Sequence, residues 1–238
     1  MSKVLDLQDL HAYYGRSHVV QGISLRVGPG EAVGLVGHNG VGKTTTLRSI
    51  MGNGPRTQGR IAFDGRDLHG AAVHARARRG LGFVPDADAV FPEMTVEENI
   101  RTGAFLRPRA GQQSCLEAAY QLFPVLAERR VQLAGTLSGG QQKMLALARG
   151  LALQPRLLMV DEPSEGLMPI NVDLIAGALR RAVEAGVGVL VVDASFHLLK
   201  TVCSRLYVMK RGVITGEHQL SEFATPDQLV ATYLRGEA

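Results

Sequence analysis

Apolar residues along this chain follow two patterns that predict two kinds of β-strand. Nearly continuous apolar runs, typical of central strands that a parallel sheet buries on both faces, occupy residues 32–36, 156–160 and 187–193. Alternating apolar and polar residues, typical of half-exposed antiparallel strands, occupy residues 4–10, 22–27 and 60–64. The chain is therefore predicted to have an α/β fold with a mainly parallel sheet and an antiparallel β region.

Helical signals fill the stretch between these strands. Thr95 with Glu98, and Ser138 with Gln141, have the Ser/Thr-x-x-Glu/Gln spacing of a capping box, in which each residue of the pair bonds the main chain of the other. No strand pattern interrupts residues 95–151, so we expect an inserted helical subdomain that Pro155 ends.

The domain organisation follows from this order of elements. We expect a single domain over residues 1–238, with a core and antiparallel β lobe at 1–90 and 155–238 and a helical lobe at about 91–154. Past the helical lobe, an amphipathic helix is predicted at 169–184 and a final helix at 226–234, and the parallel core is expected to end near Ala194.

A glycine-rich loop joins the first apolar run to a helix. Its sequence, GHNGVGKT, comprises Gly37, His38, Asn39, Gly40, Val41, Gly42, Lys43 and Thr44, and Thr45 follows. Glycines let the backbone turn its N–H groups inward around a phosphate, and the helix N-terminus favours an anion there. Lys43 adds a cation for the β- and γ-phosphates, and the Thr44 hydroxyl is placed to ligate Mg²⁺. These residues predict a nucleoside triphosphate site.

Two carboxylates follow the second apolar run. Asp161 and Glu162 come at its carboxyl end, where open α/β sheets place their ligands. We expect Asp161 to hold Mg²⁺ and Glu162, the candidate catalytic residue, to orient and polarise the attacking water.

A second helix N-terminus is also suited to an anion. Ser138, Gly139, Gly140 and Gln141 begin a helix whose glycines leave N–H groups exposed to a phosphate. Since the chain already has one phosphate loop, the second site suggests a phosphate that another copy of the protein brings.

The strings GHNGVGKT, LSGGQ and LLMVDEP together resemble the nucleotide-binding subunits of ABC transporters, over essentially the whole chain. The resemblance implies a P-loop NTPase that binds ATP and Mg²⁺ and dimerises head to tail, with each ATP between one subunit's phosphate loop and the other's LSGGQ. It also implies that Tyr14 stacks on adenine, although Tyr13 is an alternative for this role.

Longer matches narrow the resemblance. FPEMTVEEN, LFP, ERR and DEPSEGLMP look like the shorter ATPase subunit of branched-chain amino acid importers, and urea and amide importers use similar subunits. Such a subunit implies transmembrane permease subunits, a second homologous ATPase subunit or a second copy of this chain, and indirectly a periplasmic or extracellular solute-binding protein. Its expected location is cytoplasmic, peripheral on the inner face of the membrane.

Two positions depart from the general pattern of the resembled family. Asp86 stands where a glutamine is usual; an aspartate there can still ligate Mg²⁺ or water. Ala194 stands where a histidine usually contacts the γ-phosphate, and His197 is a candidate substitute. The chain is thus expected either to hydrolyse ATP slowly, or to bind ATP and complete the site of a partner ATPase.

Composition limits the other functions. The net charge is +4, and the cluster Arg76, Arg78 and Arg79 is expected to be a solvated helix face. Aromatic residues make up only 5% of the chain, so we expect no nucleic-acid partner. Cys115 and Cys203 have no metal or redox spacing.

Phe91, Pro92 and Met94 are apolar loop residues that either pack internally or dock a membrane subunit.

Overall fold

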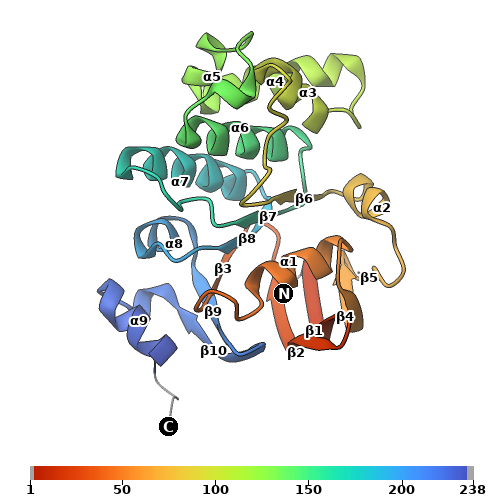
Figure 1. The fold of residues 1–238 in the computed structure, drawn as a ribbon, viewed down its shortest axis with the longest axis vertical. Coiled ribbons are helices and arrows are strands. Elements are labelled where there is room, and N and C mark those ends of the chain that lie inside the picture. Colours follow the sequence, from red (N-terminus) through yellow and green to blue (C-terminus); the bar gives the residue numbers. More distant parts are fainter. Residues whose placement is uncertain (1–2, 235–238) are drawn as a thin grey trace.

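The computed structural model describes residues 3–234, so the outermost positions of the predicted domain 1–238 lie outside the described part. Its strands form two sheets, one of order β2-β1-β4-β5 and one of order β10-β9-β3-β8-β7-β6. Figure 1 shows the antiparallel sheet at one end of the molecule and the helices α3 to α6 at the other, with the larger sheet between them. This arrangement confirms the predicted fold class.

The larger sheet is parallel except at one edge. Its strands are β3 (Ala32–Val36), β6 (Leu81–Val84), β7 (Leu157–Asp161), β8 (Gly188–Val192), β9 (Arg205–Lys210) and β10 (Val213–Gln219). Strands β3, β7 and β8 are buried at every position, as their continuous apolar runs predict. The prediction that the core ends near Ala194 was wrong, because β9 pairs in parallel with β3 and β10 extends the sheet antiparallel to β9.

The antiparallel sheet is longer than predicted. Its strands are β1 (Leu5–Tyr14), β2 (Ser17–Val27), β4 (Arg56–Phe63) and the short β5 (Arg66–Asp67). β1 pairs with β2 on one side and with β4 on the other, and both pairings contain register shifts. These irregularities break the period-2 pattern on which the sequence prediction relied, so only part of each strand was recognised.

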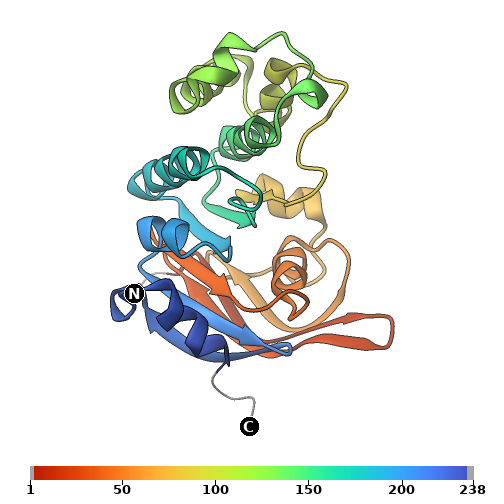
Figure 2. The same cartoon turned by 60° about the vertical axis from the view of Figure 1, so that its left-hand side comes forward.

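The helices cover the larger sheet and form one end of the molecule. They are α1 (Lys43–Met51), α2 (Val73–Arg78), α3 (Val96–Gly103), α4 (Arg109–Leu122), α5 (Pro124–Glu128), α6 (Gly139–Ala152), α7 (Pro169–Glu184), α8 (Phe196–Val202) and α9 (Pro226–Leu234), with 3₁₀ turns at Ala134–Thr136 and Leu220–Glu222. Both predicted capping boxes are present, at α3 and α6. Figure 2 shows α3 to α6 gathered at the end remote from the antiparallel sheet. Among the described residues, no helix is long and apolar enough to cross a membrane.

The core consists of two apolar clusters on opposite faces of the larger sheet. In β3, Val33 and Leu35 belong to the cluster shared with α1 and the antiparallel sheet, whereas Ala32 and Val36 belong to the one shared with the other helices. Neighbouring side chains of a strand point to opposite faces, so a strand buried on both sides contributes to both clusters. The sheet is thereby fixed on both faces, and the loops at its carboxyl edge start from rigid positions.

Candidate functional site

The candidate site residues lie at the carboxyl edge of the parallel strands. The phosphate loop follows β3, Asp86 follows β6, Glu162 follows β7 and Ala194 follows β8. β3, β8, β7 and β6 are consecutive neighbours in the sheet, so these four loops leave the same edge side by side. This is the edge at which open α/β sheets bind ligands.

The phosphate loop ends in an open helix N-terminus. Gly42 is the N-cap of α1 with φ 112°, and no side chain of the described residues caps this helix. Gly37 has φ 154°, and a Cβ there would lie 2.2 Å from the carbonyl oxygen of Met209. Both positions therefore require glycine, and the first N–H groups of α1 are left for an anion.

Lys43 is buried at the base of the loop. Its ammonium donates to the carbonyls of Gly37 at 2.9 Å and His38 at 3.0 Å, and it lies 4.0 Å from Glu162 Oε1. Burial lowers the pKa of Lys43, and the charges of Glu162 and Asp161 partly oppose that shift. The loop's own carbonyls thus hold a cation next to the candidate catalytic glutamate.

A small cavity connects these groups. Its volume is about 180 Å³, and its lining comprises Val19, Asn39, Gly40, Gly42, Lys43, Thr44, Thr45 and Glu162. The structure thus brings the phosphate loop and Glu162 to one concave site, as the sequence predicted.

Asp161 has the features expected of a cation ligand. It is 3% exposed, and its Oδ1 has no hydrogen-bond partner among the described residues. Burial raises the pKa of Asp161, and a hydrogen bond with the Thr44 side chain partly opposes the shift. A buried carboxylate oxygen that lacks a partner beside a hydroxyl matches the oxygen ligands of Mg²⁺, so Thr44 and Asp161 fit this ion.

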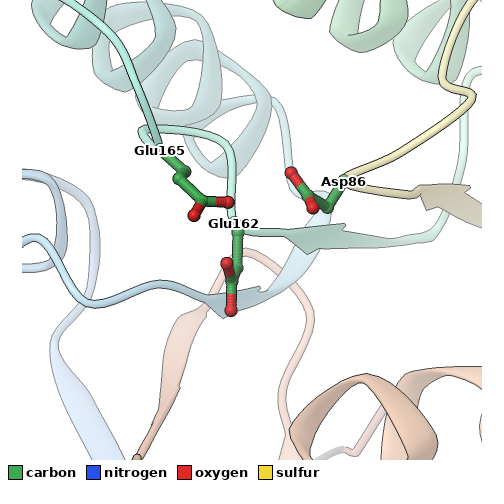
Figure 3. Close-up of side chains that lie close together, drawn as sticks. All are labelled: Asp86, Glu162 and Glu165. Atoms are coloured by element: carbon green, nitrogen blue, oxygen red, sulfur yellow. The ribbon is translucent and has the colours of Figure 1, made fainter. Parts of the chain in front are cut away.

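Three carboxylates converge beside the cavity (Figure 3). Ligand atoms of Asp86, Glu162 and Glu165 all lie within 4.8 Å of one another. Burial raises the pKa of Glu162, a hydrogen bond with Glu165 raises it further, and the charge of Lys43 opposes the shift. Glu162 also has a left-handed backbone, with φ 47°, which is a strained conformation for a residue with a side chain.

Lys143 is a member of the site that the sequence analysis missed. Its ammonium lies 3.1 Å from Asp86 Oδ1 and donates to the main-chain carbonyl of Glu162 at 2.5 Å. It extends from α6, one turn after the helix begins, and no sequence motif links it to loops that are distant along the chain. Only the packing of α6 against the strand ends brings it here.

The LSGGQ segment lies outside the lining of this cavity. The Ser138 hydroxyl accepts a hydrogen bond from the Gln141 N–H and the Gln141 side chain accepts one from the Ser138 N–H, which completes the capping box of α6. Ser138 and Gly139 are exposed, and a Cβ on Gly140 would lie 2.7 Å from the Asn171 side chain of α7. None of these four residues lines the cavity over Lys43, so the chain presents a second helix N-terminus, capped by Ser138 and partly exposed, apart from the uncapped one at α1.

The two tyrosines lie on different sides of β1. Tyr14 lines a groove between the core and the helical end of the molecule. A Cβ on Gly54 would lie 3.2 Å from the Tyr14 hydroxyl. The ring of Tyr13 stacks on His18, with centroids 4.3 Å apart, and Arg56 covers it at 4.8 Å. Neither tyrosine lines the cavity over Lys43, so adenine stacking on Tyr14 stays a prediction.

The histidine proposed as a substitute for Ala194 points elsewhere. Nε2 of His197 lies 2.6 Å from Asp173 Oδ1 on α7, and its side chain is 61% exposed. It does not line the cavity over Lys43. The structure therefore gives the substitute role no support, because the imidazole contacts Asp173 on α7 instead of the cavity.

Arg76 also differs from its prediction as part of a solvated cluster. Arg76 is 5% exposed. Its guanidinium donates to the carbonyls of Ser49 and Ile50 at the end of α1 and to those of Leu68 and Ala71 in the loop before α2. Arg78 and Arg79 are exposed, as predicted. The structure thus separates one buried capping cation from two surface cations.

A groove lies between the core and the helical end of the molecule. Its volume is about 820 Å³, and its lining includes Tyr14, Phe91, Phe105 and Leu106. Phe91 is 47% exposed and Phe105 78%. Asn99 is fully buried and bonds both the N–H and the carbonyl of Phe91, so the loop at the groove's edge is held in place.

Comparison with known proteins identifies the family. A family model described as ABC transporter matches residues 20–165, which is more than half of the chain. This chain belongs to the ABC transporter family. It is an ATP-binding subunit of an ABC transporter, and an ATPase.

Three known ABC proteins show how far the similarity extends. The high-affinity branched-chain amino acid transport ATP-binding protein BraG of Pseudomonas aeruginosa is 34% identical over 233 residues, which cover 98% of this chain and 100% of BraG. The lipopolysaccharide export system ATP-binding protein LptB of Escherichia coli is 33% identical over 225 residues, covering 94% of this chain and 93% of LptB. A solved ATP-binding subunit of an ABC transporter, 24% identical, has a TM-score of 0.85 and covers 98% of this chain and 100% of its own. The relatives agree on the ATPase subunit and differ on the solute.

Proposed function

We propose that this chain is the ATP-binding and hydrolysing subunit of an ABC importer for branched-chain amino acids or a similar small polar solute. The observation that carries the proposal is the similarity to BraG over the full length of both chains. The DEPSEGLMP string and the neighbouring motifs support the same assignment. Residues 1–238 would form a single ABC ATPase domain, with the helical lobe at about 91–154.

The cavity over Lys43 is the proposed ATP site. The N–H groups of residues 37–45 and the Lys43 ammonium would bind the β- and γ-phosphates, with Tyr14 stacked on adenine. Thr44 and Asp161 would hold Mg²⁺, which neutralises charge on the phosphates when it is bound, and Asp86 would join them through water.

Glu162 is the proposed catalytic residue. Its carboxylate lies 4.0 Å from the Lys43 ammonium, at the opening where a γ-phosphate would lie. As a base it would accept a hydrogen bond from the attacking water and hold that water in line with the phosphate. The raised pKa of Glu162 brings it nearer to neutral pH, where a general base is most effective.

The exposed LSGGQ segment is the basis for a proposed dimer. Ser138, Gly139, Gly140 and Gln141 begin a helix whose N-terminus lies outside the lining of the chain's own cavity. A second ATPase subunit, either a homologue or another copy, would present the same segment to the ATP held here.

The apolar groove is the proposed docking site for a permease subunit. Phe91, Phe105 and Leu106 are large, exposed and apolar around it. We expect Phe91→Glu to abolish assembly with the permease while ATP binding is unchanged. Assembly at the wild-type yield, measured by co-purification from a membrane extract, would contradict the assignment. A chain assembled in this way would lie on the cytoplasmic face of the membrane, with the solute-binding protein on the opposite side.

The decisive experiment for hydrolysis is the Glu162→Gln variant, assayed in the complex that a tag on this chain isolates from membranes. Loss of ATPase activity by on the order of 10² or more supports the catalytic role, whereas Glu97→Gln, in an ion pair far from the cavity, is the control. Unchanged total activity would favour the alternative, an ATP-binding subunit that completes the site of a partner ATPase; Ala194 is the observation that favours it.

Transport is tested with the solute itself. Deletion of this chain is expected to abolish uptake of radiolabelled leucine by intact cells, and the wild-type chain should restore it where Glu162→Gln does not. Unchanged leucine uptake together with lost export of an envelope lipid would instead point to an LptB-like role, which the 33% identity to LptB makes the specific alternative.

A further inference from the structure

Lys143 bridges two loops of the ATP site. Its ammonium contacts the Asp86 carboxylate after β6 and the Glu162 carbonyl after β7, while its backbone belongs to α6. The side chain is 20% exposed, so most of it is withdrawn from solvent. A lysine that gives up its hydration needs such partners, and here one of them is charged.

Asp86 creates a charge problem at this site. Ligand atoms of Asp86, Glu162 and Glu165 lie within 4.8 Å of one another, so Asp86 is a third carboxylate in this cluster. Glu162 also lines the cavity over Lys43, where the polyanionic ATP is proposed to bind. The negative charge of Asp86 also raises the pKa of Asp161, so Asp86 acts electrostatically on the proposed Mg²⁺ ligand. At these separations like charges cost about 1 kcal/mol or more each even with strong screening, unless a cation compensates them.

Lys43 is not placed to compensate Asp86. Its ammonium is bound by the carbonyls of Gly37 and His38 and is nearest to Glu162 among the carboxylates. Lys143 is the cation in contact with Asp86 among the described ion pairs. Glu162 has a left-handed backbone, and its carbonyl accepts from the same Lys143 ammonium that contacts the Asp86 carboxylate.

We propose that Lys143 is a positioning residue whose charge makes an aspartate at position 86 compatible with triphosphate binding, so that the two act as one unit. This inference rests on the proposed binding of ATP over Lys43. A positioning role can be told apart from a merely structural role of Lys143. Loss of the Lys143 charge should weaken nucleotide binding only while Asp86 is charged, and it should weaken triphosphate binding more than diphosphate binding.

The test is a double-mutant cycle in the full chain with Asp86→Asn, Lys143→Gln and the two together. Glutamine keeps a donor for the Glu162 carbonyl and removes only the charge. The probes are a non-hydrolysable ATP analogue with Mg²⁺ and ADP with Mg²⁺, measured by calorimetry, and thermal melting without nucleotide checks folding. Lys200→Gln is the matched control, since Lys200 also donates to two carbonyls but lies at α8, away from the cavity.

We expect Lys143→Gln to weaken binding of the ATP analogue about tenfold and of ADP only about threefold, because ADP carries one phosphate fewer. In the Asp86→Asn background, Lys143→Gln should change either affinity by less than about twofold, which leaves a coupling of about 1.0–1.4 kcal/mol for the ATP analogue. Lys200→Gln should change neither affinity.

Additive effects in the cycle, or equal losses for the two nucleotides, would overturn the inference. If Lys143→Gln alone is too unstable to purify, the inference is tested by comparing Asp86→Asn with the double variant. Equal affinities of these two variants for the ATP analogue support the pairing, and a tenfold difference between them overturns it. A wild-type chain that binds neither nucleotide would overturn the proposed function itself, whereas a chain that binds both with additive variants overturns this inference alone.

Discussion

Arg76 supports the end of the helix that begins at the phosphate loop, and Arg76→Met tests how much that support contributes to stability. The guanidinium donates to the carbonyls of Ser49 at 3.1 Å and Ile50 at 2.8 Å in the last turn of α1, and to those of Leu68 and Ala71 at 2.9 Å each. A cation at a helix C-terminus also interacts favourably with the helix dipole. Methionine keeps an unbranched apolar side chain and removes every donor.

The expected loss follows from these contacts. A hydrogen bond from a charged group contributes about 1.5–3 kcal/mol, and a buried carbonyl left without a donor costs about 1–3 kcal/mol. The four bonds are not additive, because water can reach part of the vacated space and the buried guanidinium itself carries a desolvation cost. We therefore expect Arg76→Met to lower the free energy of unfolding by about 3–5 kcal/mol, a large part of the 5–15 kcal/mol typical of a domain.

Urea denaturation of the full chain, followed by circular dichroism, measures this loss. Arg78→Met is the matched control, since Arg78 lies on the same helix and is exposed, and it should change stability by about 0.5 kcal/mol or less. A loss below about 1 kcal/mol for Arg76→Met, or equal losses for the two variants, would refute the view that the buried guanidinium caps α1.

Three further predictions concern single buried groups. The raised pKa of Asp161 means that the folded protein holds this proton more tightly than the unfolded chain, so stability falls as pH rises from the unfolded pKa through the folded one. Asp161→Asn should hence stabilise the nucleotide-free protein at pH 7 but not at pH 3, and should abolish stabilisation by Mg²⁺ with ATP; thermal melts at both pH values decide it. Asn99→Leu removes the acceptor of the Phe91 N–H, and faster hydrogen exchange at Phe91 is expected by mass spectrometry, with unchanged exchange as the contrary result. Burial raises the pKa of Cys203 to about 12, so a disulfide reagent at pH 8 should label Cys203 only after denaturation, and rapid labelling of the native protein would contradict its burial.

Elements whose signals are local were predicted well from the sequence. The helix at Pro169–Glu184 and the last helix at Pro226–Leu234 have their predicted limits, because proline at the first position marks where each begins. The capping boxes at Thr95 and Ser138 are closed as predicted, since both partners of each box lie within one turn. The phosphate loop was likewise predictable, because the glycines, the lysine and the helix are contiguous in the chain.

Features that depend on distant partners escaped the sequence analysis. Nothing near Arg76 in the sequence distinguishes it from Arg78, and only the packing of α2 against the end of α1 buries one and exposes the other. Lys143 was missed for the same reason, since its partners come from loops after β6 and β7. β9 was missed because its neighbour in the sheet is β3, near the other end of the chain.

Two candidate anion sites that lie apart on one chain lead us to expect that the proposed hydrolysis needs a second subunit. The cavity over Lys43 would contact a phosphate through the phosphate loop, Lys43 and Glu162, which all line it. Hydrolysis needs the attacking water to be held and bulk water to be kept out, and an open cavity of about 180 Å³ does neither. The chain's own LSGGQ helix cannot close that cavity, because Ser138 and Gly139 are exposed and lie outside its lining. A second subunit with the same exposed helix N-terminus would supply the missing wall, so we expect ATPase activity per chain to rise with protein concentration and nucleotide binding to depend on it far less. Activity per chain that stays constant on dilution, with the protein monomeric by light scattering, would contradict this account.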